Sequence, residues 1–182
     1  AAAFITSNAG KSRSRGFEGD FSFQVTDGIR LSGSLAHLDA KYIDFLGAPC
    51  FYTNLSCNAA LNNAAGMPVP RSPKWSGTLG IDVVQPLSEG LELTANAGMT
   101  FRSTAFLEES YNPSAAQKAF QKYDLRVGLR SADRRWEVAV VGKNLTNVIT
   151  AAHAFNTPLA AGVISKFIQS PRTIAVQAKV SF

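Results

Sequence analysis

The sequence YDLRVGLR, at positions 123–130, alternates strictly between apolar and polar side chains. Tyr123, Leu125, Val127 and Leu129 form the apolar set, while charged residues and one glycine fill the positions between them. A period of two places successive side chains on opposite faces of a β-strand. This stretch therefore predicts a strand with one apolar face and one polar face.

The same alternation recurs on both sides of this stretch. The clearest repeats are residues 17–25, 91–102 and 173–182, and weaker ones are residues 29–42, 75–85 and 136–143. With a partial strand in residues 2–8, the chain contains about eight strands, most of them near the 9–11 residues that cross a bilayer at a tilt. The sequence therefore predicts an all-β protein.

The connections between these predicted strands fall into two classes that alternate along the chain. Tight turns are expected at residues 26–28, 88–90 and 133–134, and long excursions at residues 43–74, 106–121 and 148–170. Compact soluble domains seldom carry several long loops without regular structure. Outer-membrane barrels combine short turns at one end with long loops at the other. The asymmetry favours a transmembrane antiparallel β-barrel.

Composition agrees with a membrane-exposed surface. The chain has 182 residues, of which 46% are hydrophobic and 17% charged, below the roughly 25% charged residues of soluble domains. No apolar run approaches the roughly 18 residues of a spanning helix, so any crossing has to be made by strands. The net charge is +5, but Lys and Arg are scattered rather than gathered on an aromatic-rich face, which argues against nucleic acid as a partner.

A soluble β-sandwich would also show alternation, with its apolar residues pointing inward. The positions of the aromatic residues favour a membrane protein, because rings gather at the two ends of the predicted strands. Trp75, Tyr123 and Trp136 begin strands, and Phe101 and Phe182 end them. Such positions correspond to the aromatic girdles at the headgroup level.

Three stretches resemble the barrels of TonB-dependent receptors. NAGK at positions 8–11, followed by RGFE at 15–18, resembles their Asn-x-Gly to Gly-x-Glu segment, and GKNLTN at 142–147 is similar to a run in their penultimate strand. The alternating terminal strand resembles the signal read by the barrel-assembly machinery, which is shared by many outer-membrane barrels. Its apolar residues are Ile174, Val176, Ala178, Val180 and Phe182.

The resemblance implies that residues 1–182 are the C-terminal part of a barrel of about 22 strands that encloses a plug. The plug domain and the earlier strands would then lie elsewhere in the receptor, and the plug would contact the TonB complex. The implied function is active uptake of a scarce nutrient, such as a ferric siderophore, cobalamin or a glycan, across the outer membrane of a Gram-negative bacterium. Outer-membrane lipid, the plug and the remaining strands are the expected partners.

Two alternatives remain open at this stage. The first is a self-contained eight-stranded outer-membrane barrel with a structural or adhesive role, because small barrels close at that strand number. The second is a soluble β-sandwich binding module. An enzyme is not expected, because His37 and His153 are the only histidines and no activated nucleophile accompanies them. No cofactor is expected, and no cluster has metal-ligand spacing. The pair Glu108 and Glu109 is expected to be solvated.

Candidate site residues lie mainly in the long loops, where binding residues concentrate. Cys50 and Cys57 are expected to form a disulfide if the chain is exported. The candidates for substrate contact are Phe51, Tyr52, Arg102, Phe106, Tyr111, His153 and Phe155. Charged residues on the polar face are expected to line the lumen and bond the plug; they are Glu18, Asp20, Arg30, Asp82, Glu92, Arg102, Asp124, Arg126, Arg130, Glu137, Lys143 and Lys179.

Overall fold

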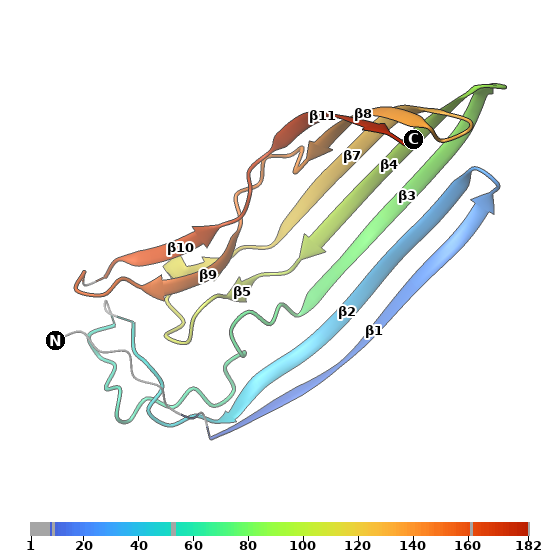
Figure 1. The fold of residues 1–182 in the computed structure, drawn as a ribbon. Coiled ribbons are helices and arrows are strands. Elements are labelled where there is room, and N and C mark those ends of the chain that lie inside the picture. The colour runs from blue at the N-terminus through green and yellow to red at the C-terminus, as the bar shows by residue number, and fades with distance from the viewer. Residues whose placement is uncertain (1–7, 9, 52–53, 161, 182) are drawn as a thin grey trace.

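Seven antiparallel strands form one curved sheet in the computed structural model, which describes residues 8, 10–51, 54–160 and 162–181 (Figure 1). In order across the sheet they are β1 (Lys11–Thr26), β2 (Ile29–Asp44), β3 (Trp75–Ser88), β4 (Leu91–Arg102), β7 (Phe120–Ser131), β8 (Trp136–Lys143) and β11 (Thr173–Val180). Each strand pairs with the next one along this order, so the sheet is a simple meander with β1 and β11 at its edges. The predicted all-β antiparallel fold is confirmed.

The predicted strands agree closely with the observed ones. β4 and β8 have the predicted bounds, whereas β1, β2, β3 and β7 extend further than the strict alternation does. The predicted strand in residues 2–8 lies outside the described residues apart from Asn8, and so does Phe182. Counted over the described part of the chain, seven long strands stand where about eight were expected.

The short and long connections lie at opposite ends of the sheet, as predicted. Figure 1 shows the three hairpin turns, β1–β2, β3–β4 and β7–β8, together at one end, which we name the turn end. The long connections between β2 and β3, β4 and β7, and β8 and β11 lie at the other end, named the loop end. This separation follows from the up-and-down order of the strands, because every second connection returns to the same end.

The long connections contain more regular structure than the sequence predicted. β5 (Ala105–Phe106) pairs with β6 (Ala116–Gln117), with the 3-10 helix η1 (Pro113–Ala115) between them. β9 (Ala151–Asn156) and β10 (Ile164–Ile168) form a second hairpin. The prediction that residues 106–121 and 148–170 lack regular structure was therefore wrong. These strands are short, from two to six residues, so their sequences carry little alternation.

The register of the strands places all the predicted apolar sets on one face of the sheet, named the apolar face. One cross-strand row joins Val83, Ala95, Val127, Val140 and Val176. Val127 is 40% exposed and Val176 is 74% exposed. The described residues include no second layer on this face, and their two hydrophobic clusters lie at the loop end. A soluble sandwich would bury these side chains, so the sandwich alternative does not fit the structure.

The opposite face, named the polar face, carries cross-strand pairs of charged and amide side chains. Arg126 Nη1 lies 2.8 Å from Glu137 Oε1, and Arg130 Nη2 lies 2.6 Å from Glu92 Oε2. Asn96 donates from Nδ2 to Asp82 Oδ1 over 2.7 Å. From the sequence, these residues were expected to share a face and to form hydrogen bonds with a plug domain. The structure shows that several of them bond each other within the wall.

The GKNLTN stretch at positions 142–147 ends β8 and holds the chain that follows it. Asn144 is 4% exposed and has a positive φ of 50°. Its side chain accepts from Val148 N and donates to Val148 O and Ser170 O. Asn147 accepts from Arg172 N through Oδ1. These bonds fix the start of the last long connection and its return to β11. The two asparagines of the GKNLTN stretch therefore have a structural role.

Gly16 marks a close approach between β1 and β2. A Cβ atom at this position would overlap with the backbone carbonyl oxygen of His37. No residue with a side chain could occupy this position without moving β2. The glycine of the RGFE stretch therefore has a packing reason as well.

Candidate functional site

The three long connections pack together at the loop end through two small hydrophobic cores. The first consists of Tyr42, Phe45, Ala48 and Ala64, with Met67, Val69 and Tyr111 packed against it. The second consists of Leu107, Ala115 and Ala154, with Ala151 and Ile164 packed against it. The first core joins the β2–β3 connection to the β4–β7 connection, and the second joins the latter to the β9–β10 hairpin. The loop end is therefore a packed layer that can hold side chains in fixed positions.

A buried carboxylate organises the β4–β7 connection. Glu108 is 5% exposed and accepts hydrogen bonds from Ser110 N, Ser110 Oγ and Asn112 N at 2.6–3.1 Å. Asn112 Oδ1 in turn accepts from Ser114 N and caps η1. A buried carboxylate needs several such donors to offset its lost hydration. The expectation that Glu108 is solvated was wrong, because the sequence does not reveal these donors.

Tyr111 belongs to the packed layer. It has a positive φ of 57°, donates its hydroxyl proton to Pro68 O over 3.0 Å, and meets the ring of Phe106 edge-on at 5.3 Å. Burial raises the pKa of Tyr111 well above its usual range, and the charge of Glu109 contributes in the same direction. The hydroxyl therefore stays protonated and keeps its bond between two connections.

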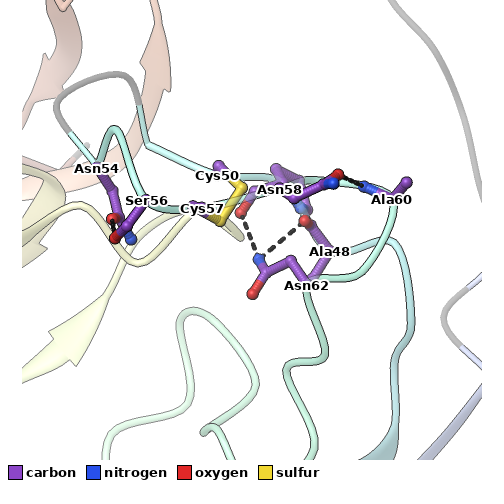
Figure 2. Close-up of a disulfide and its surroundings, with 9 residues drawn as sticks. Ala48, Cys50, Asn54, Ser56, Cys57, Asn58, Ala60 and Asn62 are labelled. Atoms are coloured by element: carbon purple, nitrogen blue, oxygen red, sulfur yellow. Dashed lines mark hydrogen bonds between the residues drawn. A yellow bond between two sulfur atoms is a disulfide. The ribbon is translucent and has the colours of Figure 1, made fainter.

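Cys50 and Cys57 form a disulfide in the β2–β3 connection (Figure 2), with Cα atoms 5.9 Å apart. Asn62 holds the backbone just before Cys50, because its Nδ2 donates to Ala48 O at 2.9 Å and to Pro49 O at 3.3 Å. Phe51, one of the substrate-contact candidates, follows Cys50 directly, while Tyr52 lies outside the described residues. The Cα separation is typical of a native bridge.

We expect free-thiol labelling of the unreduced, denatured protein to find no reactive thiol. Closing so short a loop stabilises the folded state by about 2.5 kcal/mol on the chain-entropy model, which is enough to order a loop tip. The same labelling after reduction should modify both Cys50 and Cys57, which controls for accessibility. Two reactive thiols per chain before reduction would contradict the pairing.

A cavity of about 120 Å³ lies between the strand ends and the hairpins of the loop end. Arg71 and Arg102 line it together with Gln117 and Gln169. Gln117 Oε1 accepts from Ala151 N, so the base of the β9–β10 hairpin is fixed to this wall. Within the described part of the chain, no carboxylate lies within 4.0 Å of either guanidinium. Both guanidiniums can therefore bind an anionic group without breaking an ion pair.

Aromatic rings gather beside this cavity on the β9–β10 hairpin. The ring centroids of His153 and Phe155 are 6.2 Å apart, and those of Phe155 and Phe167 are 5.8 Å apart. Phe167 is 61% exposed. Arg71 Nη1 reaches to 3.5 Å from His153 Nδ1. The rings thus offer a stacking surface next to a cation.

The structure brings most of the predicted contact residues into two groups at the loop end. Phe106 and Tyr111 form one ring pair, and His153 and Phe155 belong to the other group. Arg102 lines the cavity, whereas Phe51 lies in the disulfide segment. Arg71 and Phe167 were missed by the sequence reasoning. Arg71 sits in an irregular proline-rich stretch, where no periodicity marks it, and its contacts come from residues far away in the chain.

No group of three His, Cys, Asp or Glu side chains that could hold a metal ion occurs among residues 8, 10–51, 54–160 and 162–181. Over the same residues, no helix is both long enough and apolar enough to cross a membrane.

Solved structures of three receptors resemble the chain. The ferric yersiniabactin uptake receptor FyuA from Yersinia pestis superposes with a TM-score of 0.73 at 14% identity, over 96% of this chain and 24% of that one. The siderophore receptor PiuA from Acinetobacter baumannii gives 0.67 at 18% identity over 92% and 21%. BauA, the ferric preacinetobactin receptor from Acinetobacter baumannii, gives 0.61 at 19% identity over 93% and 22%. This chain therefore spans less than a quarter of the length of each.

At these identities the three structures establish the shared fold. A search of curated protein sequences gave no significant match. The family model described as TonB dependent receptor-like, beta-barrel matches residues 1–145, which is most of the chain. The resemblance to this family is thereby confirmed, and the chain belongs to the family of TonB-dependent receptor-like β-barrels.

Proposed function

We propose that this chain is the C-terminal part of the barrel of an outer-membrane receptor that takes up a ferric siderophore with energy from the TonB complex. The observation that carries the proposal is the pair of arginines, Arg71 and Arg102, that line a cavity beside the aromatic rings of the β9–β10 hairpin. The three similar solved structures support it, because each is described as a receptor for a siderophore or its ferric complex.

The apolar face, which no second layer of the described residues covers, supports a position in the membrane. In this arrangement the apolar face contacts the hydrocarbon, the polar face lines the lumen, and the turn end faces the periplasm. The edges β1 and β11 pair with further strands of the same receptor, and a plug domain fills the lumen and contacts TonB. The alternative of a self-contained eight-stranded barrel is disfavoured, because β1 and β11 lie at opposite edges of the described sheet.

The loop end would then meet the ligand first. Chelators of ferric iron bind it through anionic oxygen atoms, and a guanidinium forms strong paired hydrogen bonds with such oxygens. Planar aromatic groups of a chelator can stack on Phe155 and Phe167, which lie side by side on the hairpin. These contacts would orient the ligand over the lumen before the plug moves.

To test this proposal, binding affinities are measured for the complete wild-type receptor and for its double variant R71Q and R102Q. The ligands are yersiniabactin and preacinetobactin labelled with radioactive iron. Cyanocobalamin and maltodextrin are tested as representatives of other nutrient classes. We expect the wild type to bind at least one ferric chelate. We expect the variant to lose about tenfold in affinity, or roughly 1.4 kcal/mol, as for the loss of a charge-assisted hydrogen bond.

The matched control is the double variant R134Q and R135Q, which removes the same charge from the β7–β8 turn. Both arginines are exposed there, and among the described residues the one ion pair of Arg135 is with the neighbouring Asp133 at 3.2 Å. The affinity of this control variant for the ferric chelate should equal that of the wild type. Binding of cyanocobalamin or maltodextrin, with no ferric chelate bound, would refute the siderophore proposal and keep the barrel assignment.

A further inference from the structure

The apolar face changes character abruptly near the loop end of β1 and β2. Phe17 lies opposite His37 in the register of these strands, and the next pairs on the same face are Arg15 with Asp39 and Arg13 with Lys41. No register shift interrupts β1 between residues 13 and 17, so the arginines share the face of Phe17. Charged side chains thus follow directly on a long apolar band of the same face.

An aromatic layer marks the border between the two zones. Phe17, His37 and Trp75 lie in one cross-strand row of β1, β2 and β3. The His37 ring is 4.5 Å from Trp75 and 5.5 Å from Phe17, measured between centroids. Such amphipathic rings sit where hydrocarbon meets headgroups. His37 is therefore part of a girdle, not a residue of the polar wall.

The charged group beyond this layer has a surplus of positive charge. Lys41 Nζ lies 3.0 Å from Asp39 Oδ2, and Arg13 Nη2 lies 4.0 Å from the same oxygen. Arg15 is exposed and lies opposite Asp39 in register. One carboxylate therefore stands among three cations. The side chains of Arg13, Asp39 and Lys41 are between 33% and 40% exposed, so they remain open to a ligand.

The height of the group above the aromatic layer matches the depth of lipid headgroups. Two residues of a strand rise about 6.6 Å, or about 5 Å along the normal at a tilt of about 40°. Arg15 then lies about 5 Å and Arg13 about 10 Å beyond Phe17. The headgroup zone on each side of the hydrocarbon is about 5–8 Å thick. The backbone of Arg15 therefore lies at the level of lipid phosphates, and Arg13 lies just beyond that level, within reach of it through its long side chain.

We propose that Arg13, Arg15 and Lys41 form a binding site for the phosphate of a lipid headgroup in the outer leaflet. The inference rests on the membrane orientation proposed above. A guanidinium pair matches the geometry of a phosphate, and the aromatic layer below would contact the upper part of the acyl chains. A membrane lipid rather than a soluble anion is the fitting occupant, because the group adjoins the apolar band directly and faces away from the lumen.

The site is tested by native mass spectrometry of the complete receptor in detergent, titrated with dioleoyl phosphatidic acid and, for comparison, dioleoyl phosphatidylcholine. We expect the wild type to prefer phosphatidic acid and the double variant R13Q and R15Q to lose about tenfold in its affinity for that lipid. The variant R13K and R15K keeps the charge and should keep most of the affinity. The variant R134Q and R135Q, which removes two charges at the turn end, should bind phosphatidic acid with the affinity of the wild type.

Inorganic phosphate in excess should leave the bound lipid in place; its displacement of the lipid would indicate a site for soluble anions and overturn the inference. Equal affinity of the wild type and the R13Q and R15Q variant would also overturn it. The membrane orientation is checked separately with a nitroxide at Val127, which should be accessible to oxygen. If that probe is accessible while the lipid affinities are unchanged, only the lipid site fails; if it is inaccessible, the orientation itself fails.

Discussion

Arginine in place of Val127 is expected to destabilise the receptor barrel by about 2–4 kcal/mol, the cost of a cationic side chain near the middle of the hydrocarbon. Val127 lies in the middle of β7, between Ala95 and Val140, and is 40% exposed on the apolar face. If that exposed surface meets lipid, the guanidinium has neither water nor a counter-charge there. The measurement is reversible unfolding of the complete receptor in lipid vesicles by denaturant.

Val141 provides a matched control, because it lies on the neighbouring strand but on the polar face, opposite Arg126. The substitution V141R adds the same atoms on the face that would line the water-filled lumen, so it should cost clearly less than V127R, even with the like charge of Arg126 opposite. A nitroxide at Val127 should be accessible to oxygen and shielded from a polar relaxant. If V127R and V141R cost the same, or if the probe at Val127 proves inaccessible to both relaxants, the apolar face does not contact lipid and the barrel orientation is wrong.

The sequence predicted the fold well because the information is local. Alternation within each strand depends only on which face of the sheet is apolar, and the tight turns carry their own residue preferences. β8 begins at Trp136 and ends at Lys143 as predicted. The division into a turn end and a loop end follows from connection lengths alone. None of these features requires knowledge of which residues meet across the sheet.

The loop end was predicted less well because its structure depends on contacts between distant segments. Two contacts join different connections: Arg71 N donates a hydrogen bond to Phe106 O, and Leu107 packs against Ala154. No local sequence pattern predicts either contact. Glu108 illustrates the same limit, since an acidic pair in a loop has the composition of a solvated surface. Its three donors become visible only when the chain turns back on itself.

The polar face shows an intermediate case. Alternation placed Arg126 and Glu137 on the same face, but the distance of 2.8 Å between them depends on the register between β7 and β8. A tight turn constrains that register, so the pairing follows once the turn length is known. Stability of the wall thus comes partly from bonds within it. The plug then has fewer unpaired wall charges to satisfy than the sequence suggested.

Residues 1–182 expressed alone are not expected to fold into a stable, monodisperse species in detergent. The sheet has two edges, β1 and β11, and each is paired on one side only within the described residues. Every residue described in β11 is exposed, including Ile174 and Val176. Backbone groups left unpaired in hydrocarbon cost several kcal/mol each, and exposed edges also pair with other copies of the chain.

The experiment is refolding of this segment in detergent, followed by size-exclusion chromatography and limited trypsin digestion, with the complete receptor treated in parallel. The segment should aggregate or be cut rapidly at its many arginines and lysines, while the complete barrel should resist cleavage within its strands, because closure pairs both edges. A mixture of the segment with a separately expressed polypeptide that carries the remaining strands should recover some resistance. A monodisperse, protease-resistant segment would show that these strands close on themselves, and the self-contained small barrel would then replace the larger receptor as the best account of this chain.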